Sequence, residues 1–134
     1  VSGDINTWGK QPSGELWTVG IVNPMNKNKV FATFPLDDSA VETSGSYEKF
    51  VMFNGKRYSH IIDPRTGYPA SGIVSVSVFS KQTELADALA TGIFVLGVEV
   101  GLDLINQLNG IGCIIVDDKG TIHVSKNIDI KKYQ

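Results

Sequence analysis

The sequence predicts one α+β domain over residues 1–134, in which a pair of helices packs on a mainly antiparallel sheet. Three observations support this prediction. Alternating apolar segments fill most of the first half of the chain, two consecutive helical patterns follow, and a further pair of strand-like segments comes last. No internal repeat, low-complexity tract or linker divides the chain, so we expect all of these elements to share one core.

Three strands are predicted before residue 46. Residues 1–15 are rich in glycine, serine, asparagine and proline, a composition that predicts a loop. Alternating apolar residues then predict strands at 16–22, 30–36 and 40–45.

A hairpin is predicted around Asn54-Gly55, because both residues tolerate the positive φ of a type I′ turn. Its strands would cover 47–53 and 56–62. We therefore expect His60 and Asp63 at the far end of the second strand, where Pro64 interrupts it.

The strand expected at 73–80 has one mostly polar face, which carries Ser75, Ser77 and Phe79. The clearest helix follows at 83–96. Thr83 is its expected N-cap, and Gly97 is its stop signal.

A second helix is expected from Val98 to a stop at Gly110, with an apolar stripe at Val98, Leu102, Ile105 and Leu108. A last hairpin is expected around Asp118, Lys119 and Gly120.

Composition excludes several classes of protein. The chain is 42% apolar with a net charge of −2, and no basic cluster exceeds Lys131-Lys132, so binding to a nucleic acid backbone is not expected. No apolar run approaches the roughly 18–20 residues that span a bilayer, and no secretory signal pattern opens the chain. Because the chain begins with Val1, we expect a processed or truncated product. Cys113 lies in an apolar run that predicts a buried, unreactive thiol.

The segment SHIIDPRTGYPASG places His60, Asp63, Arg65 and Thr66 on one turn. Each of these residues alone is typical of ordinary turn chemistry or of a solvated surface. Together they supply an imidazole, a carboxylate, a guanidinium and a hydroxyl, and we expect them to converge on a phosphate-bearing ligand.

The backbone at Ser44-Gly45, within TSGSYE, could offer N–H groups to an anion. The same segment is also compatible with a helix start that Ser44 or Ser46 caps.

Asp87 and Thr91 lie four residues apart in the expected helix, so their side chains share one face. A carboxylate and a hydroxyl in this arrangement could supply two oxygen ligands to Mg²⁺. Alternatively, Asp87 interacts with the helix dipole and Thr91 bonds back to a helix carbonyl, and the spacing alone favours this structural interpretation.

Three segments, TSGSYEKF, GKRYSHIIDPRTGYP and ELADALATGIFVLG, occur in the order and spacing that resemble the later half of the ApbE family. Members of that family are Mg²⁺-dependent FAD:protein FMN transferases, once described as thiamine biosynthesis lipoproteins. GDINTWG and LWTVGIVNP also resemble the family's glycine-rich segment and its next strand, so the resemblance covers essentially the whole chain. It implies an ApbE-like, T-fold-type half.

The resemblance implies transfer of FMN from FAD to a Thr or Ser hydroxyl of a target flavoprotein, with release of AMP. By position, Asp87 and Thr91 match the Mg²⁺ ligands, and Ala90 lies in the same segment. Ile61 matches a residue that lines the FAD site. His60 is expected to accept the proton of the acceptor's Thr or Ser hydroxyl.

The remaining implied site residues surround the pyrophosphate. His60 and Asp63 match the family's polar turn, where we place the catalytic groups. Donors for the phosphates are expected from Arg65, Thr66 and the backbone at Ser44-Gly45.

Full-length relatives are roughly twice as long as this chain, so the resemblance implies half of a site. The chain would be a fragment, one piece of a split protein or a short paralogue, with the missing half associating in trans or with a homo-oligomer in its place. The resemblance also implies the bacterial cell envelope as the location. Two other functions stay open: a flavin- or nucleotide-binding module without chemistry, and a structural or interaction domain.

Overall fold

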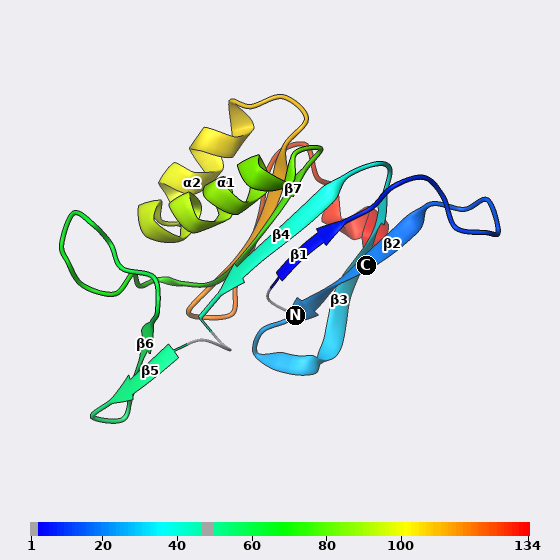
Figure 1. The fold of residues 1–134 in the computed structure, drawn as a ribbon. Helices are drawn as coiled ribbons and strands as arrows, with labels where there is room; N and C mark the ends of the chain where they lie inside the picture. Colours follow the sequence, from blue (N-terminus) through cyan, green and yellow to red (C-terminus); the bar gives the residue numbers. More distant parts are fainter. Residues whose placement is uncertain (1–2, 47–49) are drawn as a thin grey trace.

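The structure is a computed structural model, and it describes residues 3–46 and 50–134. A five-stranded antiparallel sheet with the order β1-β4-β7-β8-β9 forms its centre. Two helices cover one face of this sheet, and the β2–β3 hairpin lies against the other (Figure 1). The predicted α+β class is therefore confirmed. The strands of the central sheet are β1 (Gly3–Asn6), β4 (Ala40–Gly45), β7 (Ile73–Ser80), β8 (Gly112–Asp117) and β9 (Ile122–Val124).

The remaining elements surround this sheet. The β5–β6 hairpin projects away from the rest of the molecule (Figure 1). Both predicted hairpins, β5–β6 and β8–β9, are present, and Asn54 and Gly55 both have positive φ, as a type I′ turn requires. The outer elements are β2 (Trp17–Asn23), β3 (Asn26–Leu36), β5 (Phe50–Phe53), β6 (Lys56–Ser59), α1 (Thr83–Leu96), α2 (Val98–Asn106) and the 3₁₀ helix η1 (Ile130–Tyr133).

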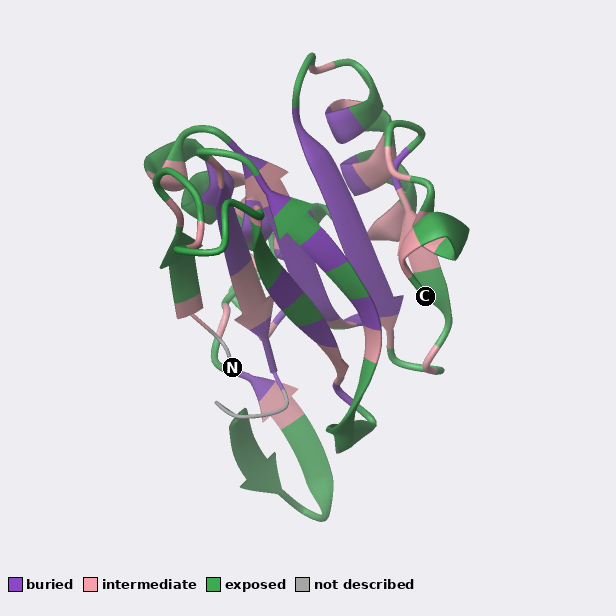
Figure 2. Cartoon of the chain, turned by 90° about the vertical axis from the view of Figure 1, so that its right-hand side faces the viewer, coloured by how far each residue is buried: buried purple, intermediate pink, exposed green. Residues whose placement is uncertain are grey.

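The core has two parts, one on each face of the sheet. On the helix side, Phe94 and Ile93 of α1 pack on Val76, Val78 and other fully buried side chains. On the opposite side, the β2–β3 hairpin packs its apolar face on the sheet. Figure 2 shows that burial concentrates in the central strands, whereas the β5–β6 hairpin is exposed except at Tyr58 and Ser59.

The polar face of β7 is buried, which its sequence does not indicate. Ser75 and Ser77 are 6% and 2% exposed, because the β2–β3 hairpin covers that side of the sheet. The Ser77 hydroxyl is satisfied by a hydrogen bond of 3.0 Å with the hydroxyl of Thr43 on β4. A buried polar face is tolerated here because neighbouring strands supply partners.

Residues 3–6 form strand β1, so the prediction of a loop over residues 1–15 was wrong at this point. Gly-Asp-Ile-Asn has weak strand propensity, and the strand forms because β4 offers it an edge to pair with. The pairing places Asp4 opposite Glu42, which matters for the site described below.

Two predicted helix boundaries are also corrected. Gln82, in extended conformation, is the N-cap of α1 instead of Thr83, whose hydroxyl accepts a hydrogen bond from Asn6 Nδ2 at 2.7 Å. Helix α2 ends at Asn106 instead of near Gly110, because the Gln107 and Leu108 N–H groups close tighter turns onto residues 104 and 105.

Two local predictions around the site change as well. Strand β6 ends at Ser59, whose hydroxyl accepts the N–H of Ile61, so His60 lies just beyond the strand. Ser44 belongs to β4, and Ser46 follows it with its N–H bonded to the Val74 carbonyl, so neither caps a helix. The predicted strand over 47–53 is found from Phe50, and residues 47–49 lie outside the described part.

Candidate functional site

Helix α1 presents its predicted ligand pair away from the core. Ala86 and Ala90 are fully buried against the sheet, and their small side chains let the helix lie close to it. Asp87 and Thr91, one helical turn apart, are both exposed. Because the Ala90 side chain faces the core, only its backbone could take part in a site.

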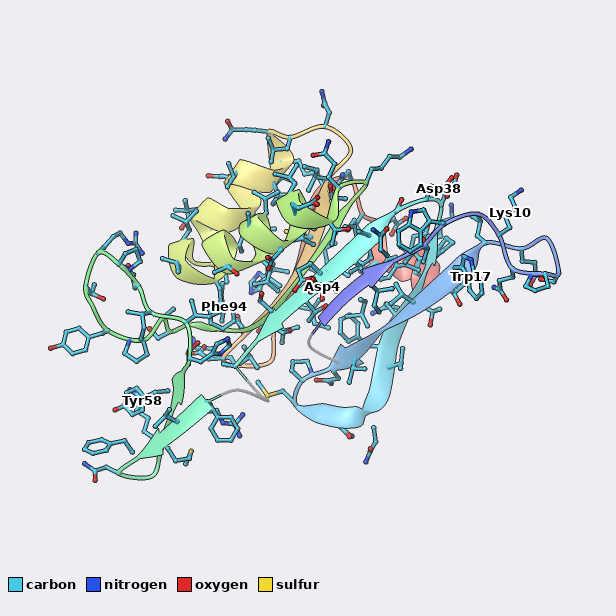
Figure 3. All side chains as sticks on the ribbon, in the orientation of Figure 1. Asp4, Lys10, Trp17, Asp38, Tyr58 and Phe94 are labelled. Atoms are coloured by element: carbon cyan, nitrogen blue, oxygen red, sulfur yellow. The ribbon has the colours of Figure 1, made fainter. Side chains whose placement is uncertain are left out.

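The sheet side of this region carries two carboxyl groups. Asp4 on β1 and Glu42 on β4 are directly paired across the strands, and their carboxyl groups are hydrogen-bonded. Glu42 also lies opposite Val78, which belongs to the helix-side core, so Glu42 faces α1. Figure 3 shows Asp4 on β1, at the edge of the sheet beside β4.

Glu42 has an unusual environment for a carboxyl group. It is 5% exposed, and its Oε2 atom has no hydrogen-bond partner among the described residues. Burial raises the pKa of Glu42 to about 8, with further increases from the hydrogen bond and charge of Asp4 and from the charge of Asp87. The charge of Asp87 is the last of these causes, and it acts from α1, the helix that packs on β4.

A hollow of about 160 Å³ adjoins the two sheet carboxyl groups. Pairing of β1 with β4 ends at Thr43 in the described part of the chain, so the backbone at Ser44-Gly45 borders this hollow. His60 closes it from the end of the β5–β6 hairpin. The structure thus brings three predicted site residues, Ser44, Gly45 and His60, to the same place as Asp4 and Glu42.

The Asp63–Arg65 turn is a separate, tightly bonded unit. The Arg65 guanidinium donates to both carboxylate oxygens of Asp63 at 3.0 and 2.8 Å, and its Nη2 also donates to the Val95 carbonyl of α1 at 3.0 Å. The Arg65 side chain and N–H lower the pKa of Asp63 below its usual value. Asp63 is thus a charged partner of Arg65 and a poor proton acceptor.

Thr66 and Ile61 help to hold this turn in shape. The Thr66 hydroxyl accepts the Tyr68 N–H at 3.1 Å, and the Ile61 carbonyl accepts the Ala70 N–H at 2.8 Å. The Ile61 side chain packs against the helix-side core. The predicted turn residues therefore divide into two groups: His60 borders the acidic hollow, whereas Asp63, Arg65 and Thr66 border a depression beside Val95 and Gly97.

The residues on α1 fit a hard cation in their chemistry. Among the described residues, no three His, Cys, Asp or Glu side chains are placed to enclose a metal ion. Asp87 and Thr91 supply one carboxylate and one hydroxyl at an exposed position on the helix that packs on β4, the strand that carries Glu42. Mg²⁺ commonly takes few protein ligands and completes its shell with water and phosphate oxygens.

Sequence reasoning missed Asp4 and Glu42. Asp4 lies in a segment whose composition predicts a loop, and only the pairing of β1 with β4 brings it to the site. Glu42 did carry a signal, because it is the only charged residue of the predicted strand over 40–45.

Comparison with known proteins assigns the chain to a family. The model of the ApbE family matches residues 1–115. A FAD:protein FMN transferase of Treponema pallidum is 40% identical over 114 residues, which cover 84% of this chain and 32% of that protein. The ApbE protein of Thermotoga maritima superposes with a TM-score of 0.83 at 34% identity, over 93% of this chain and 41% of that one.

A flavin transferase ApbE of Vibrio cholerae gives a similar result, with a TM-score of 0.79 at 34% identity. The match covers 100% of this chain and 43% of that protein. The chain therefore spans well under half of the length of the relatives it matches. Both the sequence and the fold place this chain in the ApbE family.

Proposed function

We propose that the chain is the metal-bearing C-terminal portion of a Mg²⁺-dependent FAD:protein FMN transferase. The observation that carries the proposal is the placement of Asp87 on the exposed flank of α1, within electrostatic reach of a buried carboxyl group beside the His60 hollow. Family membership supports the same reaction, because several relatives are named for it.

In the proposed reaction, a Thr or Ser hydroxyl oxygen of the acceptor attacks the FMN phosphorus of FAD. The bond from that phosphorus to the bridging oxygen breaks, and AMP leaves with the electron pair. His60 accepts the proton of the hydroxyl, provided that it is in its neutral form. Such transfer depends on positioning and on offsetting charge on the phosphate oxygens more than on covalent help from the protein.

Each remaining predicted residue has a place in this proposal. Asp87 and Thr91 hold Mg²⁺, with Ala90 contributing at most its backbone; the ion, when bound, offsets the charge of the pyrophosphate. The backbone at Ser44-Gly45 offers N–H groups to a phosphate. Ile61 lines the FAD site.

The Asp63–Arg65 pair and Thr66 fix the turn that follows His60. The bonds from Arg65 to Asp63 and to the Val95 carbonyl support this positioning role. To donate hydrogen bonds to a phosphate of the ligand as well, the Arg65 guanidinium would have to keep its present position.

The proposed partners are FAD, a target flavoprotein and either the rest of the transferase in trans or a second copy of the chain. The exposed apolar side chains of Val51, Met52 and Phe53 on the projecting hairpin support such association. In the described part of the chain, neither helix has the length and hydropathy needed to cross a membrane. A lipoprotein precursor in the bacterial cell envelope is proposed from the family likeness alone.

Release of AMP tests the proposed reaction. The chain is mixed with FAD, MgCl₂ and a flavoprotein that offers a Thr or Ser hydroxyl, and nucleotides are separated by chromatography, for the wild type, Asp87→Asn and Asp103→Asn. We expect AMP from the wild type, at least a 100-fold loss in Asp87→Asn, and no change in Asp103→Asn, which removes an exposed carboxylate from α2.

Two results would contradict the proposal. Full AMP release by Asp87→Asn would remove the metal assignment. FAD binding without AMP release by the wild type would support a non-catalytic flavin-binding module, and binding of neither FAD nor Mg²⁺ would support a structural domain.

A further inference from the structure

Glu42 is a buried carboxyl group beside the candidate site, and the proposed reaction does not use it. It is 5% exposed, and its Oε2 lacks a hydrogen-bond partner among the described residues. A buried oxygen of a carboxyl group without a partner costs free energy, because water solvates it strongly outside the protein. Such a group indicates that a ligand or ion completes the site.

Two further carboxyl groups act on Glu42, and His60 borders the same hollow. Asp4 lies directly opposite on β1, and Asp87 approaches from α1. None of the ion pairs within residues 3–46 and 50–134 involves any of these three groups. When Glu42 loses its proton, the like charges at this poorly solvated place repel each other, and a bound cation would remove this repulsion.

The oxygen donors here match a hard divalent cation. Carboxylate and hydroxyl oxygens are the ligands that Mg²⁺ and Mn²⁺ prefer, whereas the thiol of Cys113 lies in the core and plays no part. No three His, Cys, Asp or Glu side chains of the described residues form a complete cage. A cation here would therefore take two carboxylates and fill its remaining positions with the Thr91 hydroxyl, water or phosphate.

We propose that Glu42 is a further ligand of the divalent cation, which it holds from the sheet side while Asp87 and Thr91 hold it from the helix. This inference rests on the proposed function, because it adds a residue to the same cation site. It makes β4 one wall of the site and α1 the other. The cation then links two elements that already pack against each other.

Cation binding without substrate tests this inference. Mn²⁺ is titrated into the wild type, Glu42→Gln, Asp87→Asn and Asp103→Asn, and free Mn²⁺ is measured by electron paramagnetic resonance. Gln keeps the shape of Glu and can donate a hydrogen bond to Asp4, so Glu42→Gln should fold normally. We expect at least 10-fold weaker binding in Glu42→Gln and in Asp87→Asn, and binding within 2-fold of wild type in Asp103→Asn.

A thermal melt with and without MgCl₂ supplies a second readout. A cation that binds only the folded protein raises its melting temperature, and the rise should shrink in Glu42→Gln. The melt without MgCl₂ also shows directly whether the variant is folded.

The outcomes separate this inference from the proposed function. Wild-type Mn²⁺ affinity in Glu42→Gln together with loss in Asp87→Asn would overturn the role of Glu42 and keep the Asp87 site. Wild-type affinity in both variants, or no saturable binding by the wild type, would overturn both. Weakened binding in Glu42→Gln with no AMP release by the wild type would support the cation site and contradict the transferase reaction.

Discussion

The carboxyl groups of Asp4 and Glu42 are hydrogen-bonded to each other across the antiparallel pair β1–β4. Such a bond requires a proton on at least one of them, since two carboxylates are both acceptors. Glu42 is the group that holds it, because burial favours its neutral form. The edge of the sheet nearest α1 thus carries an acid that is protonated near neutral pH, and the following prediction depends on this.

Stability should fall as pH rises from about 5 to 8, by at most about 1.4 kcal/mol per pH unit from this group. The sign follows from a folded-state pKa of about 8 against an ordinary value of 4.5. The folded protein keeps a proton that the unfolded chain has lost, so the stabilisation is complete below pH 4.5 and disappears through pH 8. Urea unfolding of the cation-free wild type and of Glu42→Gln at several pH values measures this change in the free energy of unfolding.

Glu42→Gln should flatten this slope, because the amide does not titrate. Other groups also make the free energy of unfolding depend on pH, among them Asp63 and Asp117, whose pKa values are lowered. Their contribution is the same in the wild type and in Glu42→Gln. Parallel curves for the two proteins would show that Glu42 ionises normally.

Arg65→Ala should loosen the turn after His60 without a large loss of global stability. The guanidinium joins Asp63 to the Val95 carbonyl at the end of α1, but it is 61% exposed, so solvent screens the ion pair and its contribution to stability is small. Hydrogen–deuterium exchange of peptides covering residues 60–70 should speed up. Arg57→Ala, another exposed arginine that lies on β6, is the control and should leave these peptides unchanged. Equal exchange in all three proteins would show that the turn does not depend on this tether.

Gly101→Ala should destabilise the protein by about 1–3 kcal/mol, because an added Cβ overpacks a close helix contact. That Cβ would lie 2.6 Å from Cγ2 of Ile93, which is fully buried. Gly92→Ala on α1 is the matched control: its Cβ would meet nothing within 4 Å, and Ala should stabilise the helix by about 0.5–1 kcal/mol. Chemical denaturation measures both, and equal effects of the two substitutions would contradict this account of the α1–α2 contact.

Local sequence patterns determined the elements whose conformation depends on near neighbours. The Asn54-Gly55 turn, the two helices and the hairpin around residues 118–120 follow from positive-φ residues and apolar spacing. The position of Asp87 and Thr91 on one flank of α1 follows from helical periodicity alone. The spacing of these two residues did not show that the helix packs over the strands that carry Asp4 and Glu42.

Tertiary pairing decided what local patterns could not. Strand β1 exists because β4 offers it an edge, and Ser75 and Ser77 are buried because a hairpin distant in sequence covers them. Glu42 acquires its raised pKa from burial in the folded sheet, with smaller contributions from Asp4 on β1 and Asp87 on α1. The physical reason is that desolvation and charge interaction depend on distance in space, which sequence separation does not encode, whereas turn geometry and helix periodicity depend on neighbours along the chain.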